Sequence, residues 1–433
     1  MIPESVEILS KYLKINTTNP PGNEVKAARF FAAIFEKENI PYRTYESQPG
    51  RVSLKATLTG SGQKGPIILL NHMDVVLANP GEYALDPFGG EIVDGYICGR
   101  GALDMKGIGV MQLMAILAMK GEAVSLNRDL VFLAVADEET GGSLGMKYLM
   151  ENYPEDFKAV LVLNEGGQGF SNMVPDKTVM LLATGEKGPC WLKLSGKGPS
   201  GHGSTPHSRN ALVRMTKALN RVLAVELPVI ITPIVEEYFK KLSSEWSFLD
   251  PFKKDGQHKT LARVLKKSGM LEVPQINAMV RNTISLNLLK AGHKINVIPD
   301  YAEAQLDIRL LPGQDTRAFI DFIKEALADI EIEIEVLLAS PGNVSDTDND
   351  DYLIIQDVVN DHFKNPLMPL YLMSGITDSR FFREKGITAY GFFPVVVPVE
   401  HLSMIHGLDE KISIDNLIKG TAVYIDLVRK LCT

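Results

Sequence analysis

The stretch IILLNHMD at residues 67–74 decides the architecture, because four apolar residues run almost directly into a histidine and a carboxylate. The stretches LVFLAVADEETGG at 130–142 and AVLVLNEGG at 159–167 repeat this pattern. Short apolar runs of this kind are typical of strands that are buried on both faces of a parallel sheet. Helical spacing at 108–120 and 143–151 separates them. The alternation predicts an α/β fold with a mostly parallel sheet covered by helices.

A second pattern interrupts the first. From residue 187 to 343 we expect strands and helices of a separate α+β domain, inserted into a first domain formed by 1–186 and 344–433. Within the inserted domain, the polar, lysine-rich segment 250–274 forms a further insertion to which we assign no chemistry.

Composition excludes several classes of protein. The chain has 433 residues, 45% of them hydrophobic and 7% aromatic, which suits an ordinary globular protein of two domains. The net charge of -8 and the lack of a long basic run argue against nucleic-acid binding. Every apolar run is shorter than the roughly 20 residues of a membrane helix, so we expect no membrane partner.

The first residues and the cysteines bear on localisation. The start MIPESVE carries acidic residues where a secretory signal has basic ones, so we expect a cytoplasmic protein. Cys98, Cys190 and Cys432 lack CxxC spacing and are expected to be free thiols rather than disulfides or a thiolate metal cluster.

The polar residues that follow the apolar strands predict a metal centre. Parallel strands end at one edge of their sheet, where open α/β folds bind ligands. Several carboxylates brought together there are costly unless a cation neutralises them. Histidine and carboxylate ligands without thiolates suit zinc first, with cobalt or manganese as alternatives. More than three carboxylates plus histidines exceed the needs of one four-coordinate ion, so we expect two divalent metal ions.

Single residues in this pattern also have simpler explanations. Asp104 lies in a glycine-flanked loop from which it could reach two ions, although an aspartate before a helix is more often an N-cap. Asp74 could orient the imidazole of His72, or both could be exposed in a turn. For Glu138 and Glu139, one carboxylate could bind metal while the other acts as general base; an exposed acidic turn is the ordinary alternative.

Seven motifs, taken together and in this order, resemble the zinc-dependent aminoacylase, carboxypeptidase G and succinyl-diaminopimelate desuccinylase metallopeptidases, including their carboxypeptidase S-like branch. The resemblance covers essentially the whole chain. It implies that 1–186 and 344–433 form the catalytic, metal-binding domain and that 187–343 is the lid or dimerisation domain. The motifs are HMDVV at 72–76, GALDMKG at 101–107, DEE at 137–139 with Gly141-Gly142, NEG at 164–166, GPSGHGS at 198–204, NVIP at 296–299, and His406-Gly407 with Glu410.

The resemblance implies a role for each of these residues. His72 and Glu165 would bind one metal, Glu139 and His406 the other, and Asp104 would bridge them. Asp74 would orient His72, and Glu138 would be the general base. His406 is preferred to His401 because Gly407 and Glu410 follow it. A cis peptide bond is expected at Asp104-Met105.

Four further residues and one histidine are expected to meet the substrate. The resemblance implies that His202 polarises the scissile carbonyl, often from the partner subunit, whereas His207 is interpreted as a surface residue. Asn296 and Arg309 would hold the substrate carboxylate or the oxyanion, although a salt bridge to Asp307 explains Arg309 nearly as well. Gly375 and Thr377 would line the site, with Ile376 inserted between them relative to the family pattern.

The expected function is a dinuclear-metal hydrolase that cleaves the amide bond of N-acyl amino acids through attack of a metal-bridging hydroxide. The substrate would be a small molecule with a free carboxylate, and the protein a homodimer through the lid. A carboxypeptidase or dipeptidase acting on short peptides is the alternative. A non-catalytic binder of amino-acyl ligands is remoter, because it predicts the loss of Glu138 or a ligand and none is missing. A scaffold stabilised by metal would leave no open coordination position.

Overall fold

The computed structural model describes residues 3–433, so the first two residues of the predicted catalytic domain lie outside the described part. The chain divides into two compact units. Unit 1 comprises Met1–Thr184, Ser345–Tyr371 and Thr377–Thr433, and unit 2 comprises Gly185–Val344 and Leu372–Ile376. The division therefore falls within two residues of 186 and 343, and a short return of the chain at Leu372–Ile376 was not expected.

The centre of unit 1 is a parallel sheet with the strand order β6-β3-β7-β19. These strands are β3 (Ile67–His72), β6 (Leu130–Val135), β7 (Leu161–Phe170) and β19 (Thr388–Val397). Antiparallel strands flank the centre: β1 (Tyr42–Gln48) and β2 (Arg51–Leu58) beyond β6, and β9 (Leu182–Glu186) beyond β19. Every residue of β3 and β6 is buried, which explains why β6 and the first four residues of β3 are continuously apolar rather than alternating.

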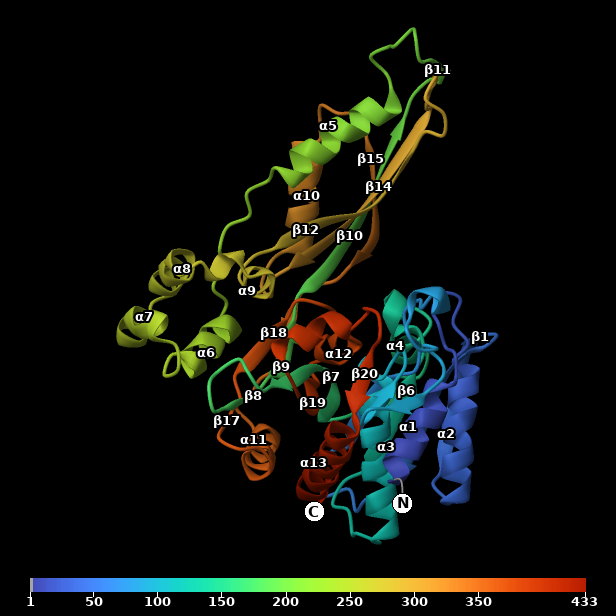
Figure 1. Cartoon of the computed structure of the whole chain (residues 1–433), viewed down its shortest axis with the longest axis vertical. Helices are drawn as coiled ribbons and strands as arrows, with labels where there is room; N and C mark the ends of the chain where they lie inside the picture. The colour runs from blue at the N-terminus through green and yellow to red at the C-terminus, as the bar shows by residue number, and fades with distance from the viewer. Residues whose placement is uncertain (1–2) are drawn as a thin grey trace. The chain divides into compact units, whose positions relative to one another are not determined.

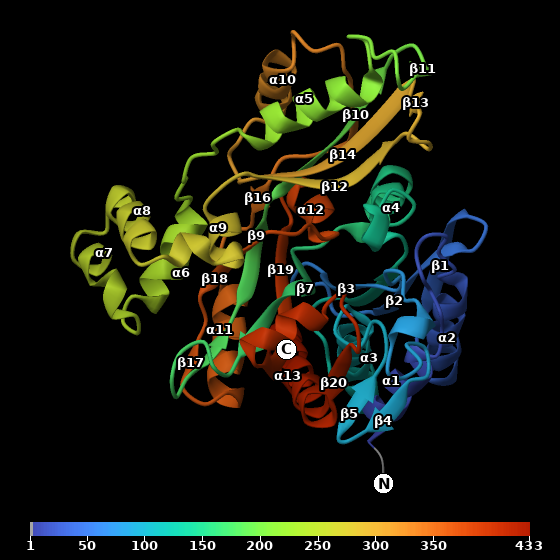
Figure 2. The ribbon, with the colours of Figure 1, turned by 45° about the horizontal axis from the view of Figure 1, so that its top comes forward.

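Helices cover both faces of this sheet (Figures 1 and 2). One face carries α1 (Glu4–Leu13), α2 (Val25–Lys37), α3 (Lys106–Gly121) and α13 (Ile414–Cys432), and α11 (Asp350–His362) packs on α13. The other carries α4 (Met146–Asn152) and α12 (Ser379–Arg383). Neighbouring residues of a strand serve opposite faces, so Leu133 packs with Met146 of α4 while Phe132 contacts Phe31 of α2. The predicted fold class is confirmed.

The strand register brings the polar ends of three strands to one edge. Ile67 of β3 lies opposite both Leu130 of β6 and Leu161 of β7, so the three strands start level with one another. Because they are parallel, the residues that follow their apolar cores emerge side by side.

A smaller antiparallel sheet joins distant parts of unit 1. It has the order β20-β5-β4 and consists of β4 (Glu91–Val93), β5 (Tyr96–Cys98) and β20 (Lys411–Ser413). Lys411 pairs with Cys98 in this sheet, which places the loop after Cys98 beside the segment before Lys411. This small sheet was not predicted from the sequence.

Unit 2 is built on a four-stranded antiparallel sheet with the order β12-β14-β10-β15 (Figure 1). Its strands are β10 (Gly188–Lys197), β12 (Thr283–Ala291), β14 (Tyr301–Leu310) and β15 (Glu333–Ala339). Helices α5 (Ala211–Leu223) and α10 (Thr316–Ala326) pack on one face, where Leu192 and Leu306 meet Met215 and Ile323. Alternate burial along β14 matches a sheet with one covered face, so this unit is the expected α+β insertion.

The remaining elements extend these two units. A two-stranded ribbon joins β11 (Gly201–His202) to β13 (Val297–Ile298), and the lysine-rich segment lies in a group of short helices: α6 (Pro233–Leu242), α7 (Asp250–Asp255), α8 (His258–Lys267) and α9 (Pro274–Met279). Short strands complete the sheet margins: β8 (Thr178–Met180), β16 (Asn343–Val344), β17 (Pro366–Leu367) and β18 (Leu370–Met373).

The structure also bears on the cysteines and on membrane-spanning helices. The three cysteines are free thiols, with Cys190 and Cys432 buried and Cys98 partly so. Among residues 3–433, none of the helices has the length and apolar character needed to cross a bilayer.

Candidate metal centre

Five predicted ligands converge at the polar edge of the unit 1 sheet. His72 is the last residue of β3, Glu139 lies in the turn after β6, and Glu165 lies within β7. Asp104 comes from the loop before α3 and His406 from the segment before β20. Residues separated by more than 300 positions in the chain thus meet in one cluster within unit 1.

Asp104 lies between two groups of side chains. Its Oδ1 atom is 3.1 Å from Nε2 of His72, and Glu165 Oε1 is 3.5 Å from the same Nε2. The other oxygen, Oδ2, is 3.0 Å from Nε2 of His406, which is itself 3.3 Å from Glu139 Oε2. The two carboxylate oxygens of Asp104 therefore face two different histidine and glutamate pairs. His406, rather than the competing His401, occupies this position.

The cluster has the composition and spacing of a metal site. The ligand atoms of His72, Asp104 and Glu139 all lie within 4.8 Å of one another, and so do those of His72, Glu138 and Glu165. Imidazole nitrogens and carboxylate oxygens are the donors that zinc, cobalt and manganese accept. The residues present therefore fit divalent cations, and spacing alone does not separate a ligand role from a base role for Glu138.

The pKa shifts of these groups show that the cluster favours added positive charge. Burial raises the pKa of Glu138 and Glu165 well above the ordinary value, and the Asp104 carboxylate adds to the effect on both. Burial opposes protonation of His72, but the carboxylates of Glu165 and Asp104 outweigh it and raise the pKa of His72 well above its usual range. Hydrogen bonds with Asp104 and Glu139 raise the pKa of the half-exposed His406 to about 10. Divalent cations would neutralise the carboxylates in place of these protons.

Asp74 connects the two sides of the cluster. Its backbone carbonyl oxygen is 2.9 Å from Nδ1 of His72, closer than its carboxylate at 3.6 Å. A proton on Nδ1 leaves Nε2 free to bind metal. The Asp74 carboxylate instead accepts the backbone N–H groups of Glu138 and Glu139, at 3.2 and 3.1 Å. Asp74 thus contacts the predicted base and one ligand in addition to His72.

A buried ion-pair network, which the sequence did not suggest, supports the turn that carries Glu138 and Glu139. Asp137, in a left-handed conformation with φ of 72°, accepts a hydrogen bond from Arg51 Nη2 at 2.7 Å. Arg51 also forms a bidentate pair with Glu24, at 2.8 and 2.9 Å. Asn19 donates to both Asp74 and Asp137, at 2.8 and 3.2 Å. No local pattern marks Asn19, Glu24 or Arg51 as partners of the motif residues Asp74 and Asp137, because the contacts form only in the folded chain.

A second network holds the Asp104 loop. Oε1 of Glu410 accepts the backbone N–H groups of Leu103 and Asp104, at 2.7 and 3.0 Å. Oε2 accepts Gly101 N–H at 3.0 Å and Arg100 Nη1 at 2.7 Å. Arg100 also donates to the carbonyl oxygen of Gly407, next to His406, at 2.7 Å. The peptide bond Asp104-Met105 in this loop is cis, as expected.

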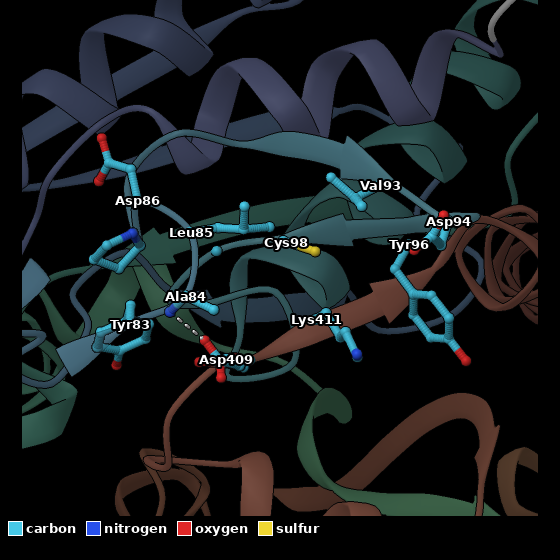
Figure 3. A pocket seen from close by; sticks show the side chains of 13 residues that line it. Tyr83, Ala84, Leu85, Asp86, Val93, Asp94, Tyr96, Cys98, Asp409 and Lys411 are labelled. Atoms are coloured by element: carbon cyan, nitrogen blue, oxygen red, sulfur yellow. Dashed lines mark hydrogen bonds between the residues drawn. The ribbon is translucent and has the colours of Figure 1, made fainter.

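A cavity of about 250 Å³ lies behind this network (Figure 3). Its walls include Tyr83, Tyr96, Cys98 and Lys411 together with Glu410. None of the five predicted ligands, all of which lie within residues 3–433, lines this cavity, so it is not the predicted metal site.

Asp378 is a further residue that the sequence analysis did not select. It is 1% exposed, and among the described residues neither of its carboxylate oxygens has a hydrogen-bond partner. Burial raises the pKa of Asp378 to about 7. Its neighbour Arg380 donates to the Gly141 carbonyl oxygen at 2.7 Å and so contacts the loop that follows Glu139. The adjacent Thr377, expected to line the site, is buried, and its hydroxyl accepts the backbone N–H of Ser379 at 3.1 Å.

The predicted substrate residues of unit 2 fall into separate groups. His202 and Asn296 lie together, because Gly203 N–H donates to the Asn296 carbonyl oxygen at 2.9 Å. Arg309 lies at the opposite end of β14 and forms a bidentate ion pair with Asp307, at 2.6 and 3.0 Å, so the salt-bridge alternative is realised. Gly375 lies in the short return segment of this unit. His207, expected at the surface, is only half-buried as a residue, but both ring nitrogens are buried.

The α/β fold holds a cluster of histidines and carboxylates that fits divalent metal ions, and comparison with known proteins identifies the chain as a metal-dependent hydrolase. The family model described as Peptidase family M20/M25/M40 matches residues 68–430, and the chain belongs to this family.

Individual relatives and structures agree with this assignment. The chain is 33% identical over 383 residues to an N-fatty-acyl-amino acid synthase/hydrolase of Xenopus tropicalis, covering 84% of this chain and 72% of that protein. It is 28% identical to aminoacylase-1 of Dictyostelium discoideum, covering 99% of this chain and 97% of that protein. The M20 family metallo-carboxypeptidase Sso-CP2 of Sulfolobus solfataricus has a similar fold, with a TM-score of 0.80, 20% identity and 99% coverage of both chains.

Proposed function

We propose that this hydrolase uses two divalent metal ions to remove the acyl group from N-acyl amino acids. The observation that carries the proposal is the position of Asp104, whose two oxygens face the His72–Glu165 pair and the His406–Glu139 pair. We assign one ion to each pair, zinc first, with Asp104 as the shared ligand. The bound ions would supply Lewis acidity, which polarises the substrate carbonyl and makes water more acidic.

Glu138 is the proposed general base. Its pKa is raised by burial, so it has the proton affinity needed to take a proton from the attacking water. The same carboxyl would then give the proton to the leaving amino-acid nitrogen. Glu139 is the better ligand of the two, because its carboxylate already contacts His406 and accepts the Val76 N–H at 3.2 Å. Asp74 would hold both residues in place through their backbone N–H groups.

The residues of unit 2 suggest how the substrate is held. Arg309, Asn296, Gly375 and Thr377 are proposed to contact the substrate carboxylate or the oxyanion, and His202 to polarise the carbonyl. Arg309 and the start of β14 are eight residues apart, or about 27 Å along an antiparallel strand. His202 and Asn296 lie beyond that start. One small substrate could not contact both ends of one sheet, so we propose a homodimer in which each site uses His202 of the partner subunit and its own Arg309.

The choice of substrate rests on the relatives. One relative, 33% identical to this chain, is by name a synthase/hydrolase of N-fatty-acyl-amino acids, and another is by name an aminoacylase. An amide next to a free carboxylate is also the bond cleaved by a carboxypeptidase or dipeptidase, so the same site could serve short peptides. We propose a cytoplasmic location.

A substrate panel tests the proposal. Zinc-loaded and cobalt-loaded protein would be incubated with N-acyl amino acids of short and long acyl chain, their methyl esters and matched dipeptides, and released amine would be measured. We expect the N-acyl amino acids to be hydrolysed fastest and the methyl esters hardly at all. Preferential cleavage of dipeptides would replace the deacylase with the peptidase, and no amide cleavage by any metal-loaded form would overturn both.

A further inference from the structure

The loop that carries His202 contains a residue placed to control the chemistry of its ring. The backbone around His202 is fixed on both sides. His202 pairs with Val297 in the β11–β13 ribbon, and the Thr205 N–H donates to the His202 carbonyl oxygen at 3.0 Å. A side chain at Gly203 would approach the backbone of Asn296 to 3.2 Å, so a glycine suits this crossing. What remains free is the orientation and protonation of the imidazole.

Ser204 contacts one nitrogen of that imidazole twice. Its backbone N–H donates to Nδ1 of His202 at 3.2 Å, and its hydroxyl oxygen lies 2.7 Å from the same Nδ1. A backbone N–H can only donate, so Nδ1 must accept and cannot carry the proton. The hydroxyl then donates to Nδ1 as well, and in the neutral ring the proton lies on Nε2.

We infer that Ser204 is a positioning residue that holds His202 as the Nε2–H tautomer. This inference rests on the proposed role of His202 in polarising the substrate carbonyl. With Nδ1 occupied by Ser204, only Nε2 can face the substrate. An Nε2–H group donates a hydrogen bond to a carbonyl oxygen and to the negative charge that develops on it. The other tautomer would direct a nitrogen lone pair at that oxygen and repel it.

The tautomer can be measured directly, without turnover. Protein labelled with 15N-histidine would be studied by long-range 1H–15N NMR at a pH where imidazole is neutral, and His202 assigned by its absence from the His202→Asn spectrum. We expect an unprotonated Nδ1 and a protonated Nε2 in the wild type and in Ser204→Thr, which keeps the hydroxyl. Ser204→Ala loses the shorter, 2.7 Å contact of the hydroxyl and keeps only the backbone donor at 3.2 Å, so part of the ring population should adopt the other tautomer. A proton on Nδ1 in the wild type would overturn the inference.

Kinetics separate this inference from the proposed function. Ser204→Ala should lower kcat about tenfold with little change in KM, as for other residues that orient a functional histidine. Ser204→Thr should restore the rate, and Ser208→Ala, the same change at an exposed position of the same loop, should leave it unchanged. In the His202→Asn background, Ser204→Ala should have no further effect.

Two outcomes have different meanings. If His202→Asn abolishes turnover while Ser204→Ala has wild-type kcat, the inference about Ser204 is wrong and the role of His202 stands. If His202→Asn itself keeps wild-type kcat, the proposed role of His202 is wrong and Ser204 has no histidine to assist.

Discussion

Glu410 accepts the backbone N–H of Asp104 at 3.0 Å, although the two residues are 306 positions apart. The same carboxylate accepts the N–H groups of Gly101 and Leu103 and pairs with Arg100. The shape of the loop that presents Asp104 therefore depends on a charge from the other end of the chain. A motif that contains Glu410 is thus part of the metal centre even though Glu410 does not face the metal ligands.

Replacing Glu410 by Gln should weaken this loop. The amide has one acceptor oxygen in place of two and turns an NH2 group toward existing donors. We expect zinc affinity to fall about 10- to 100-fold, as for other residues that support ligands. The free energy of unfolding should fall by about 3 kcal/mol, because a buried ion pair loses one partner. Chelator competition and urea unfolding measure the two effects, with the exposed Glu325→Gln as control. Unchanged zinc affinity would show that the loop holds Asp104 without Glu410.

Glu138 and Glu139 should respond differently to the same substitution. Glu138→Gln removes the proposed base, and kcat should drop at least about 100-fold while the metal content stays that of the wild type. Glu139→Gln removes a proposed ligand, so the protein should retain less metal after gel filtration. Metal analysis and steady-state kinetics on both variants distinguish the roles. Near-normal turnover in Glu138→Gln, or metal loss in that variant instead, would reverse the assignment.

Sharing of His202 between subunits can be tested with mixed dimers purified by two affinity tags. A dimer of one Glu138→Gln chain and one His202→Ala chain should have about half the wild-type rate, because one of its two sites is intact. A dimer of a wild-type chain and a chain with both substitutions should be inactive, because each site then lacks one residue. If each site used its own His202, the first dimer would be inactive and the second would have about half the wild-type rate. Light scattering that finds only monomers would exclude the shared site.

Lys187 should make stability depend on pH. The side chain is fully buried, and burial lowers its pKa from 10.5 to about 7. Between these two values the unfolded chain binds a proton that the folded chain has released, so the free energy of unfolding rises with pH, by at most about 1.4 kcal/mol per unit. The free energy of unfolding of the wild type minus that of Lys187→Met should therefore increase from pH 7 to pH 10. A constant difference would mean that the ammonium keeps its charge through its contacts with Ala278, Arg281 and Thr283.

The sequence predicted the part of the site that follows from local pattern. An apolar strand that ends in a polar residue is visible in one short stretch, so strand pattern alone places His72, Glu139 and Glu165 at one edge of the sheet. Asp104 and His406 follow no strand. The glycine-flanked loop left Asp104 open as a ligand or an N-cap, and His406 was expected to join the cluster only because its motif resembles a known family. The structure brings these five residues together in unit 1.

The supporting networks could not be predicted in the same way. The contacts of Arg51 with Glu24 and Asp137 depend on which surfaces meet in the folded chain, and neither Arg51 nor Glu24 has a distinctive neighbourhood in the sequence. The role of Arg309 also could not be decided from the sequence. A bidentate arginine suits a substrate carboxylate and a neighbouring aspartate equally well. Only the fold shows that Asp307 takes Nε and Nη2, while Nη1 has no hydrogen-bond partner among residues 3–433.

The number of metal ions per chain tests the central claim most directly. Metal-free protein would be loaded with excess zinc, passed through gel filtration, and analysed for zinc by mass spectrometry, with Asp104→Ala treated in parallel. The arrangement of the two histidine and glutamate pairs around Asp104 predicts two zinc ions per wild-type chain and fewer in the variant. A wild-type protein that reaches full activity with one zinc ion or none would contradict it.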